Sequence, residues 1–237
     1  LFGADIGGRG QEVFMGSMGI YIIRYEALEK LLDPSMGEDF GHHVIPQAIP
    51  KFRVYAFPFT GYWEDIGTIS SFYEANLALT DDQPKFELFD PEMKLFTRAR
   101  FLPGARLGNA LIRRCHICAG AKSSDFTAEH SIIGARAVIK SGVTIQDSYI
   151  SGSDFYETPT ALDENRELNR PDMGIGGDTT IRRAIIDKNA RIGYGVTIAP
   201  PPHCADLDGP GYAVRDGIVI VEKNAVIPDG SVIPELK

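Results

Sequence analysis

A double carboxylate follows an aromatic pair in the segment GYWEDIGT at residues 61–68. Glu64 and Asp65 come directly after Tyr62 and Trp63, and a glycine and a predicted helix start follow. Acidic oxygens on such a short turn suit magnesium, which proteins commonly hold with one or two carboxylates plus substrate phosphates. The same residues also fit a tight turn with two solvated acids. We expect the two aromatic rings to pack and stiffen the turn, although they could also stack on a sugar.

Two other motifs could carry chemistry. Ser17 stands between Gly16 and Gly19 in GSMGIY. Its hydroxyl group both donates and accepts hydrogen bonds, which suits a sugar phosphate, although a strand-entry serine without a ligand fits as well. Cys115 and Cys118 form a C-x2-C motif, but no second pair of ligands follows at zinc-site spacing. We therefore interpret these cysteines as small residues in a strand region and expect no metal there.

The elements that must position these residues change in character near residue 100. Before it, apolar runs at 20–23 and 54–59 alternate with helix-like stretches at 25–32 and 69–79. This alternation predicts strands and helices of an α/β domain, with Thr68 as the N-cap of the second helix. The proline-punctuated stretch that follows, 84–104, is typical of an extended connector.

After residue 104 the sequence repeats with a period of six. Aliphatic residues recur at this spacing in four groups: Ile133, Ile139 and Ile145; Ile175 and Ile181; Ile186, Ile192 and Ile198; Val221, Ile227 and Ile233. Such a rhythm indicates a β-helix in which short strands form coils that stack on one another. Two interruptions, 152–174 and 199–217, are predicted to be loops, either a binding face or simply tolerated surface.

The residues above also carry a resemblance to a known family. GYWEDIGTISSFYEANLALT at 61–80 is similar to the end of the catalytic domain in glucose-1-phosphate adenylyltransferases. Further similar segments follow family order: MGSMGIYIIRY at 15–25, DFGHHVIP at 39–46, FELFDPEMKLFTRARFLP at 86–103, GSDFYET at 152–158 and IRRAIIDKNARIG at 181–193. The resemblance implies part of an α/β, Rossmann-like nucleotidyltransferase domain at 1–83, a linker at 84–104, and a left-handed β-helix of hexapeptide repeats at 105–237 that serves regulation and oligomerisation.

The resemblance implies a reaction and its residues. The family transfers an adenylyl group from ATP to glucose 1-phosphate with Mg²⁺, giving ADP-glucose and pyrophosphate for glycogen or starch synthesis. Asp65 matches the carboxylate that helps to hold the metal, and Ser17 matches the serine that contacts glucose 1-phosphate. Glu64, Asp39 and Trp63 are further candidates for the substrate pocket.

The resemblance also implies regulation by an anionic sugar-phosphate or phosphoglycerate-type effector. Lys188 and Lys223 match activator-site lysines, and Arg182 could contribute to the same site. On charge alone, solvated surface lysines are the more ordinary interpretation. A homo- or hetero-tetramer is the implied assembly.

Several alternatives stay open. The family's glycine-rich nucleotide loop is expected upstream of Leu1, so we expect this chain alone to be inactive. A noncatalytic regulatory subunit or another sugar-1-phosphate nucleotidyltransferase would share most of these motifs. A hexapeptide-repeat acyltransferase would need a catalytic histidine, for which His116, His130 and His203 are available.

Composition narrows the partners and the compartment. The net charge of −8 without a basic block disfavours nucleic acid, and no apolar run is long enough to span a bilayer. Three cysteines fit a reducing compartment. We expect a cytoplasmic protein, or one of the plastid stroma if the source is a plant.

Overall fold

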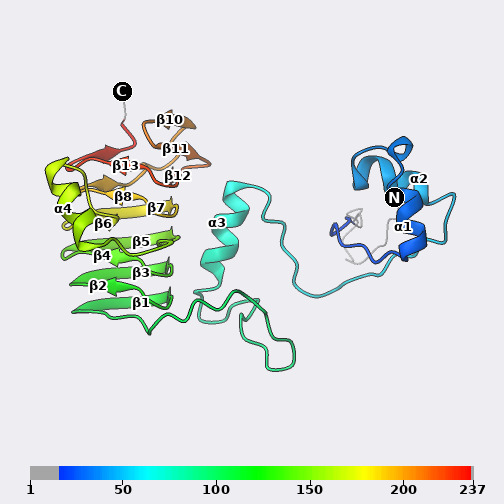
Figure 1. Cartoon of the computed structure of the whole chain (residues 1–237), viewed down its shortest axis with the longest axis horizontal. Helices are drawn as coiled ribbons and strands as arrows, with labels where there is room; N and C mark the ends of the chain where they lie inside the picture. The colour runs from blue at the N-terminus through cyan, green and yellow to red at the C-terminus, as the bar shows by residue number, and fades with distance from the viewer. Residues whose placement is uncertain (1–15, 236–237) are drawn as a thin grey trace. The chain divides into compact units, whose positions relative to one another are not determined.

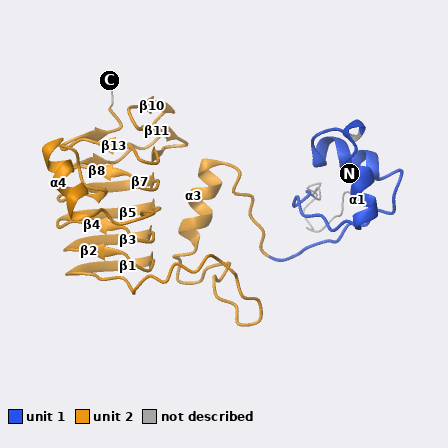
Figure 2. Ribbon diagram, in the orientation of Figure 1, with its two compact units in different colours: residues 1–61 blue, residues 62–237 orange. Residues whose placement is uncertain are grey.

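The computed structural model describes residues 16–235 (Figure 1). The chain divides into two compact units, residues 1–61 and residues 62–237 (Figure 2). Each unit is described by itself below. Within the described residues, no helix combines the length and the apolar character that crossing a membrane requires.

The described part of unit 1 is built from short helical segments. They are α1 (Tyr25–Leu31), the 3-10 turn η1 (Pro34–Met36), the π-helical turn η2 (Phe40–Val44) and α2 (Ile45–Ala48). Leu31, Val44 and Ala48 form a small buried cluster, against which Ile23, Phe40 and Phe52 pack.

The helix predicted at 25–32 is confirmed by α1, whereas the strands predicted at 20–23 and 54–59 are wrong as elements. Both runs lie in irregular, largely exposed backbone. A strand needs a neighbouring strand to satisfy its backbone hydrogen bonds, and residues 16–61 contain none in this structure.

Helix α3 (Ile69–Ala78) opens the structured part of unit 2 and confirms the predicted helix and its cap. The Thr68 hydroxyl oxygen accepts from the Ser71 N–H at 3.1 Å, and the Ser71 hydroxyl accepts from the Thr68 N–H at 3.1 Å. This reciprocal capping box satisfies N–H groups that a helix start leaves unpaired.

After an irregular stretch at 84–104, unit 2 continues as a stack of coils whose strands are mostly parallel (Figure 1). Four long strands pair in parallel: β1 (Ala110–Ile117), β3 (Phe126–Ile133), β5 (Val143–Ile150) and β7 (Thr180–Ile186). The shorter strand β12 (Ile218–Val221) pairs in parallel with the second half of β7. The short strands β9 (Thr197–Ile198) and β14 (Val232–Ile233) extend the same sheet from the other half of β7. A separate sheet contains β2 (Lys122–Ser123), β4 (Val138–Ile139), β6 (Gly174–Ile175), β8 (Arg191–Ile192) and β13 (Val226–Ile227).

Each long strand bends in its middle, so that its two halves lie on different faces. The bend falls at a residue with positive φ, which is uncommon outside glycine: Arg114, His130, Asp147 and Arg183, with φ between 46° and 47°. These four residues occupy the same corner in successive coils, because the residues on either side of them are paired in register.

The predicted six-residue rhythm is confirmed as the core of this stack. One buried aliphatic residue of each coil points inward from each face, and equivalent residues of neighbouring coils lie in register. The three stacks are Ile145, Ile181, Ile198 and Ile233; Ile133, Ile150, Ile186 and Val221; and Ile139, Ile175, Ile192 and Ile227. Burial of this continuous aliphatic column is what stabilises coils that could not bury an apolar face alone.

The two interruptions of the repeat carry structure of their own. The first contains helix α4 (Pro159–Glu167), which begins at the N-cap Thr158. The second contains β10 (Leu207–Gly209) and β11 (Tyr212–Arg215), which extend the sheet as antiparallel strands beside β12. Both interruptions were predicted as loops because they lack the six-residue rhythm. The structure corrects this prediction, with a helix in the first and two strands in the second.

Candidate functional site

The predicted metal carboxylate lies on an exposed turn just before α3. One oxygen of Asp65 accepts a hydrogen bond from the Gly67 N–H at 3.0 Å, and Glu64 beside it is exposed. The second oxygen of Asp65 is left for another ligand. Residues 16–235 contain no group of three or more side chains placed to hold a metal ion. The part of Asp65 as a metal ligand stays a prediction.

The expected packing of the aromatic pair is wrong in this structure. Tyr62 and Trp63 are 42% and 45% exposed, and neither belongs to a buried cluster. Residues 53–68 form no helix or strand and are exposed throughout, so this segment does not bury the rings in a core. The turn is held instead by the Asp65 hydrogen bond and the Thr68 cap.

Ser17 lies in an open glycine turn of unit 1. Its hydroxyl oxygen accepts from the Gly19 N–H and contacts the Tyr21 hydroxyl, each at 3.2 Å. Gly19 has φ of 69°, and no atom lies within 4 Å of where a side chain at Gly16 or Gly19 would begin. The backbone here is thus accessible to a ligand.

Asp39, also in unit 1, caps a helical turn. Its carboxylate accepts from the His42 N–H at 2.6 Å at the start of η2. That hydrogen bond lowers the pKa of Asp39 below its usual value. The structure therefore gives Asp39 a local structural role, and its part in a substrate pocket stays a prediction.

The two predicted effector lysines meet at one carboxylate. The Lys188 ammonium lies 3.2 Å from one oxygen of Asp154, and the Lys223 ammonium lies 3.7 Å from the other. The Asn189 amide also donates to Asp154 at 3.1 Å and to Asn224 at 3.2 Å. Lys188 and Lys223 occupy the same corner in successive coils, since Arg191 and Val226, three residues further on, are paired in register.

Arg182 is not brought to this corner. It precedes the bend at Arg183 and pairs in register with Gln146, whereas Lys188 follows the face formed by residues 184–186. A whole face of the coil thus separates Arg182 from the lysine pair along the chain.

Sequence reasoning missed Asp154 and Asn189 as partners of the lysines. The dipeptide Lys-Asn occurs in both DKNARIG and EKNAVIP, and this repetition at one corner was a signal for Asn189 and Asn224. Asp154 gave no comparable signal, because it reaches the corner from the first insertion.

A cavity of about 240 Å³ lies beside the first insertion. Lys140 and Arg170 line it together with Asp172, Tyr194 and Asp229. Lys140 pairs with Asp172 at 3.6 Å, and the Tyr194 hydroxyl is hydrogen-bonded to Asp178. Lys140 is therefore accompanied by a carboxylate, whereas the Arg170 guanidinium donates to the Asn165 amide oxygen at 2.8 and 2.6 Å.

The two cysteines of the C-x2-C motif have a structural explanation. Cys115 donates to the Arg113 carbonyl at 3.1 Å, as Ser131 and Ser148 donate at 2.7 Å to the carbonyls two residues before them. Cys115, Ser131 and Ser148 are in register, so the same side-chain-to-carbonyl hydrogen bond repeats beside the bend in successive coils. Burial raises the pKa of Cys115, which disfavours a reactive thiolate at that position, whereas Cys118 is exposed.

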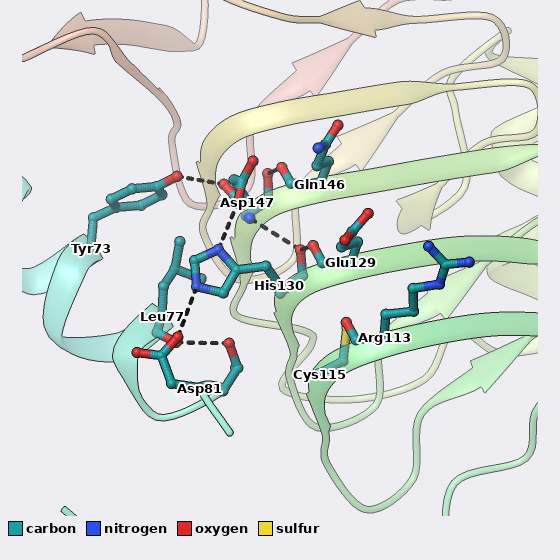
Figure 3. A network of polar contacts seen from close by, with 12 residues as sticks. Tyr73, Leu77, Asp81, Arg113, Cys115, Glu129, His130, Gln146 and Asp147 are labelled. Carbon is teal, nitrogen blue, oxygen red and sulfur yellow. Dashed lines mark hydrogen bonds and ion pairs between the residues drawn. The ribbon is translucent and has the colours of Figure 1, made fainter. Parts of the chain in front are cut away.

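Helix α3 packs on the β-helix through a mixed apolar and polar junction. Tyr73 and Leu77 are buried with Ile185 and Ile218. Figure 3 shows the Tyr73 hydroxyl directed at the backbone of Asp147, to whose carbonyl it donates at 2.6 Å. His130 contacts the Asp147 carboxylate at 2.6 Å and lies 3.7 Å from Asp81, just after α3 (Figure 3). His130 is thus engaged at the junction.

The three-faced stack of parallel coils defines unit 2 as a parallel β-helix, on which helix α3 packs. Residues 100–232 match the model of the GLGC left-handed parallel β-helix domain, and residues 12–82 match the nucleotidyl transferase model. The first match covers more than half of the 237 residues, so the chain belongs to the GLGC-type left-handed β-helix family. The combination is characteristic of glucose-1-phosphate adenylyltransferases and confirms the resemblance seen in the sequence. The chain is accordingly a member of the sugar-phosphate nucleotidyltransferases.

Proposed function

We propose that the protein to which this chain belongs makes ADP-glucose and pyrophosphate from ATP and glucose 1-phosphate. The observation that carries this proposal is the joining of both matches in one chain: a nucleotidyl transferase segment that runs through α3, followed by a GLGC-type β-helix. Nucleotidyl transfer depends mainly on positioning and on neutralising phosphate charge, which suits a site of exposed polar groups.

Each predicted site residue has a role in this proposal. Asp65 would hold Mg²⁺ with its free oxygen, and the cation would neutralise charge on the phosphates during transfer. Ser17 would hydrogen-bond the sugar phosphate from its open turn. Glu64, Asp39 and Trp63 would line the substrate pocket; the exposure of Trp63 leaves its ring free to stack on a sugar.

We also propose that Lys188 and Lys223 bind an anionic effector of the sugar-phosphate or phosphoglycerate type. The support is their convergence from adjacent coils, which places two ammonium groups around one anionic group. Arg182, on the neighbouring face, takes no part at this corner in the proposal.

The proposed assembly is a homo- or hetero-tetramer formed through the β-helix, in the cytoplasm or the plastid stroma. The long strand β1 lies at one end of its sheet, and an unpaired strand edge favours association. Light scattering coupled to size exclusion would measure the assembly, and a monomer at micromolar concentration would contradict it.

The decisive experiment measures pyrophosphate release from ATP and glucose 1-phosphate with magnesium. Two proteins are assayed: residues 1–237 alone, and the same residues extended by any upstream coding sequence. In the active form, Asp65→Asn should lower kcat by about 100-fold or more, because a lost electrostatic stabiliser of the transition state typically costs that much. Raising the magnesium concentration should partly restore the Asp65→Asn rate.

Glu64→Gln is the matched control, since it removes the same charge from the neighbouring position. Its expected effect is less than about tenfold, because the resemblance assigns the metal to Asp65 and not to Glu64. Equal losses in both variants would argue for a general charge effect and against Asp65 as the metal ligand. No turnover in any form would favour the noncatalytic regulatory subunit.

A further inference from the structure

Lys188 and Lys223 already contact an anionic group, the carboxylate of Asp154 in the same chain. Asp154 lies in the first insertion, 34 residues before Lys188 in sequence, and reaches the corner where Lys188 and Lys223 meet. In the described part of the chain, each of these two ammonium groups pairs with Asp154 and with no other carboxylate. The nearby Asp187 carboxylate is directed to the backbone, accepting from the Lys188 N–H at 2.6 Å.

We propose that Asp154 is a built-in competitor for the anion site: its carboxylate neutralises the lysine pair when no ligand is bound and leaves the pair when a phosphate-bearing ligand enters. This inference rests on the effector site proposed above and concerns how that site is regulated. In this role Asp154 lowers the affinity of the lysine pair for anions, so that only a more highly charged group displaces the Asp154 carboxylate.

The contacts that Asp154 makes are suited to displacement. The side chains of Asp154, Lys188 and Lys223 are 43%, 41% and 53% exposed. Ion pairs at such exposure are weakened by solvent and salt, so their loss costs little. Hydrogen bonds from Lys188 and Asn189 hold the pKa of Asp154 below its usual value, so the carboxylate is charged at neutral pH.

Displacement would need no movement of the insertion, because the backbone around Asp154 is anchored separately. The Asp154 N–H donates to the Asn189 side-chain oxygen at 2.8 Å, and the Ser153 N–H donates to the Ala135 carbonyl at 2.9 Å. The Asn189 N–H in turn donates to the Gly152 carbonyl at 3.1 Å. Rotation of the Asp154 side chain alone would therefore release both lysines.

A phosphate group matches what the departing carboxylate would leave behind. The Lys188 ammonium and the Asn189 amide donate hydrogen bonds to Asp154, and the Lys223 ammonium forms an ion pair with it at 3.7 Å. A phosphate monoester offers three acceptor oxygens and nearly two negative charges, whereas the carboxylate offers two oxygens and one charge. The site thus favours phosphate esters over simple carboxylates.

The test compares two variants of the full chain that lose the same charge from the same insertion. Asp154→Asn removes the proposed competitor, and Asp163→Asn removes an exposed carboxylate of α4 that pairs only locally with Arg166. Binding of 3-phosphoglycerate, and of inorganic phosphate as a second probe, is measured by calorimetry at constant ionic strength. Asp154→Asn should tighten binding by about two- to fivefold, the range that one exposed ion pair permits, and Asp163→Asn should change it by less than about 1.5-fold.

Variants of the cations separate the failure of this inference from the failure of the effector site. If Lys188→Gln with Lys223→Gln abolishes binding but Asp154→Asn leaves it unchanged or weakens it, the effector site stands and the role given to Asp154 is overturned. If the double lysine variant binds normally, or if no variant binds either probe, the effector site and this inference both fail. Both also fail if Lys140→Gln removes binding, which would place the anion in the cavity lined by Lys140 and Arg170. Asp154→Ser, which also removes the charge, repeats the comparison should Asp154→Asn melt at a lower temperature than the wild type.

Discussion

At the scale of single residues, the first insertion is tied to the β-helix by a few buried polar groups. The Glu157 carboxylate, only 6% exposed, pairs with Arg191 at 2.6 Å and accepts from Asn165 and from the Met173 N–H. Tyr156 donates to the Gly120 carbonyl at 2.5 Å, and Lys122 lies over its ring at 3.8 Å. These contacts explain why the segment GSDFYET holds Asp154 at the lysine corner.

Glu157→Gln should destabilise the fold by about 1–3 kcal/mol, because it removes the charge that compensates the buried Arg191. Burial raises the pKa of Glu157, but its hydrogen bonds outweigh burial and the net shift is downward. A lowered folded pKa contributes stability that is present above the unfolded pKa, near 4.3, and lost as pH falls through the folded pKa.

Urea unfolding at pH 7 and at about pH 3 tests this prediction: the difference between wild type and Glu157→Gln should be larger at pH 7. Asp163→Asn, on the exposed pair with Arg166, serves as the control and should cost less than about 0.5 kcal/mol. A difference that grows toward pH 3 would contradict the assigned role of the Glu157 charge.

At the scale of elements, α3 connects the two matched parts of the chain. It lies within the nucleotidyl transferase match, which ends at residue 82, yet it belongs to the same compact unit as the β-helix. Its cluster also includes Phe72 and Tyr149, whose rings meet edge to face at 5.3 Å. The compact units therefore divide at residue 61, while the domain boundary at 83 stays a prediction from the sequence.

Leu77→Ala should loosen α3 from the β-helix, because a buried leucine reduced to alanine typically costs about 2–5 kcal/mol. Hydrogen exchange should show faster exchange of the amides in α3, with protection in β3 and β5 largely kept. Glu74→Gln, at an exposed position of the same helix, should leave the exchange unchanged. Slowed or unchanged exchange in Leu77→Ala would show that α3 does not depend on this contact.

At the scale of the whole molecule, the β-helix has the energetics of a linear repeat. Each coil contacts mainly its neighbours, so a central coil loses contacts on two sides when its core residue is cut back, and a terminal coil loses them on one. The stack Ile145, Ile181, Ile198 and Ile233 offers both cases, since Ile181 is internal and Ile233 is in the last coil.

Ile181→Ala should therefore cost more stability than Ile233→Ala, although both residues are buried and lose the same atoms. The internal change is expected to fall within the range of about 2–5 kcal/mol typical of core isoleucines. Urea or thermal unfolding of the full chain measures both variants, and exposed Val232→Ala gives the baseline. Equal losses of unfolding free energy at the two positions would mean that the stability of a coil does not depend on how many neighbouring coils it contacts.

The sequence by itself determined the β-helix, because its inward positions recur every six residues and each must be aliphatic to fill the stack. It also determined α1, α3 and the Thr68 cap, whose signals are local. It could not determine that the runs at 20–23 and 54–59 form no strands, since a strand depends on a partner elsewhere in the chain. It did not reveal that Tyr62 and Trp63 are exposed, because burial depends on what packs against a turn. Only the tertiary structure brought Asp154 to Lys188 and Lys223 and left Arg182 on another face, because such contacts depend on where the insertion and the coils lie in space.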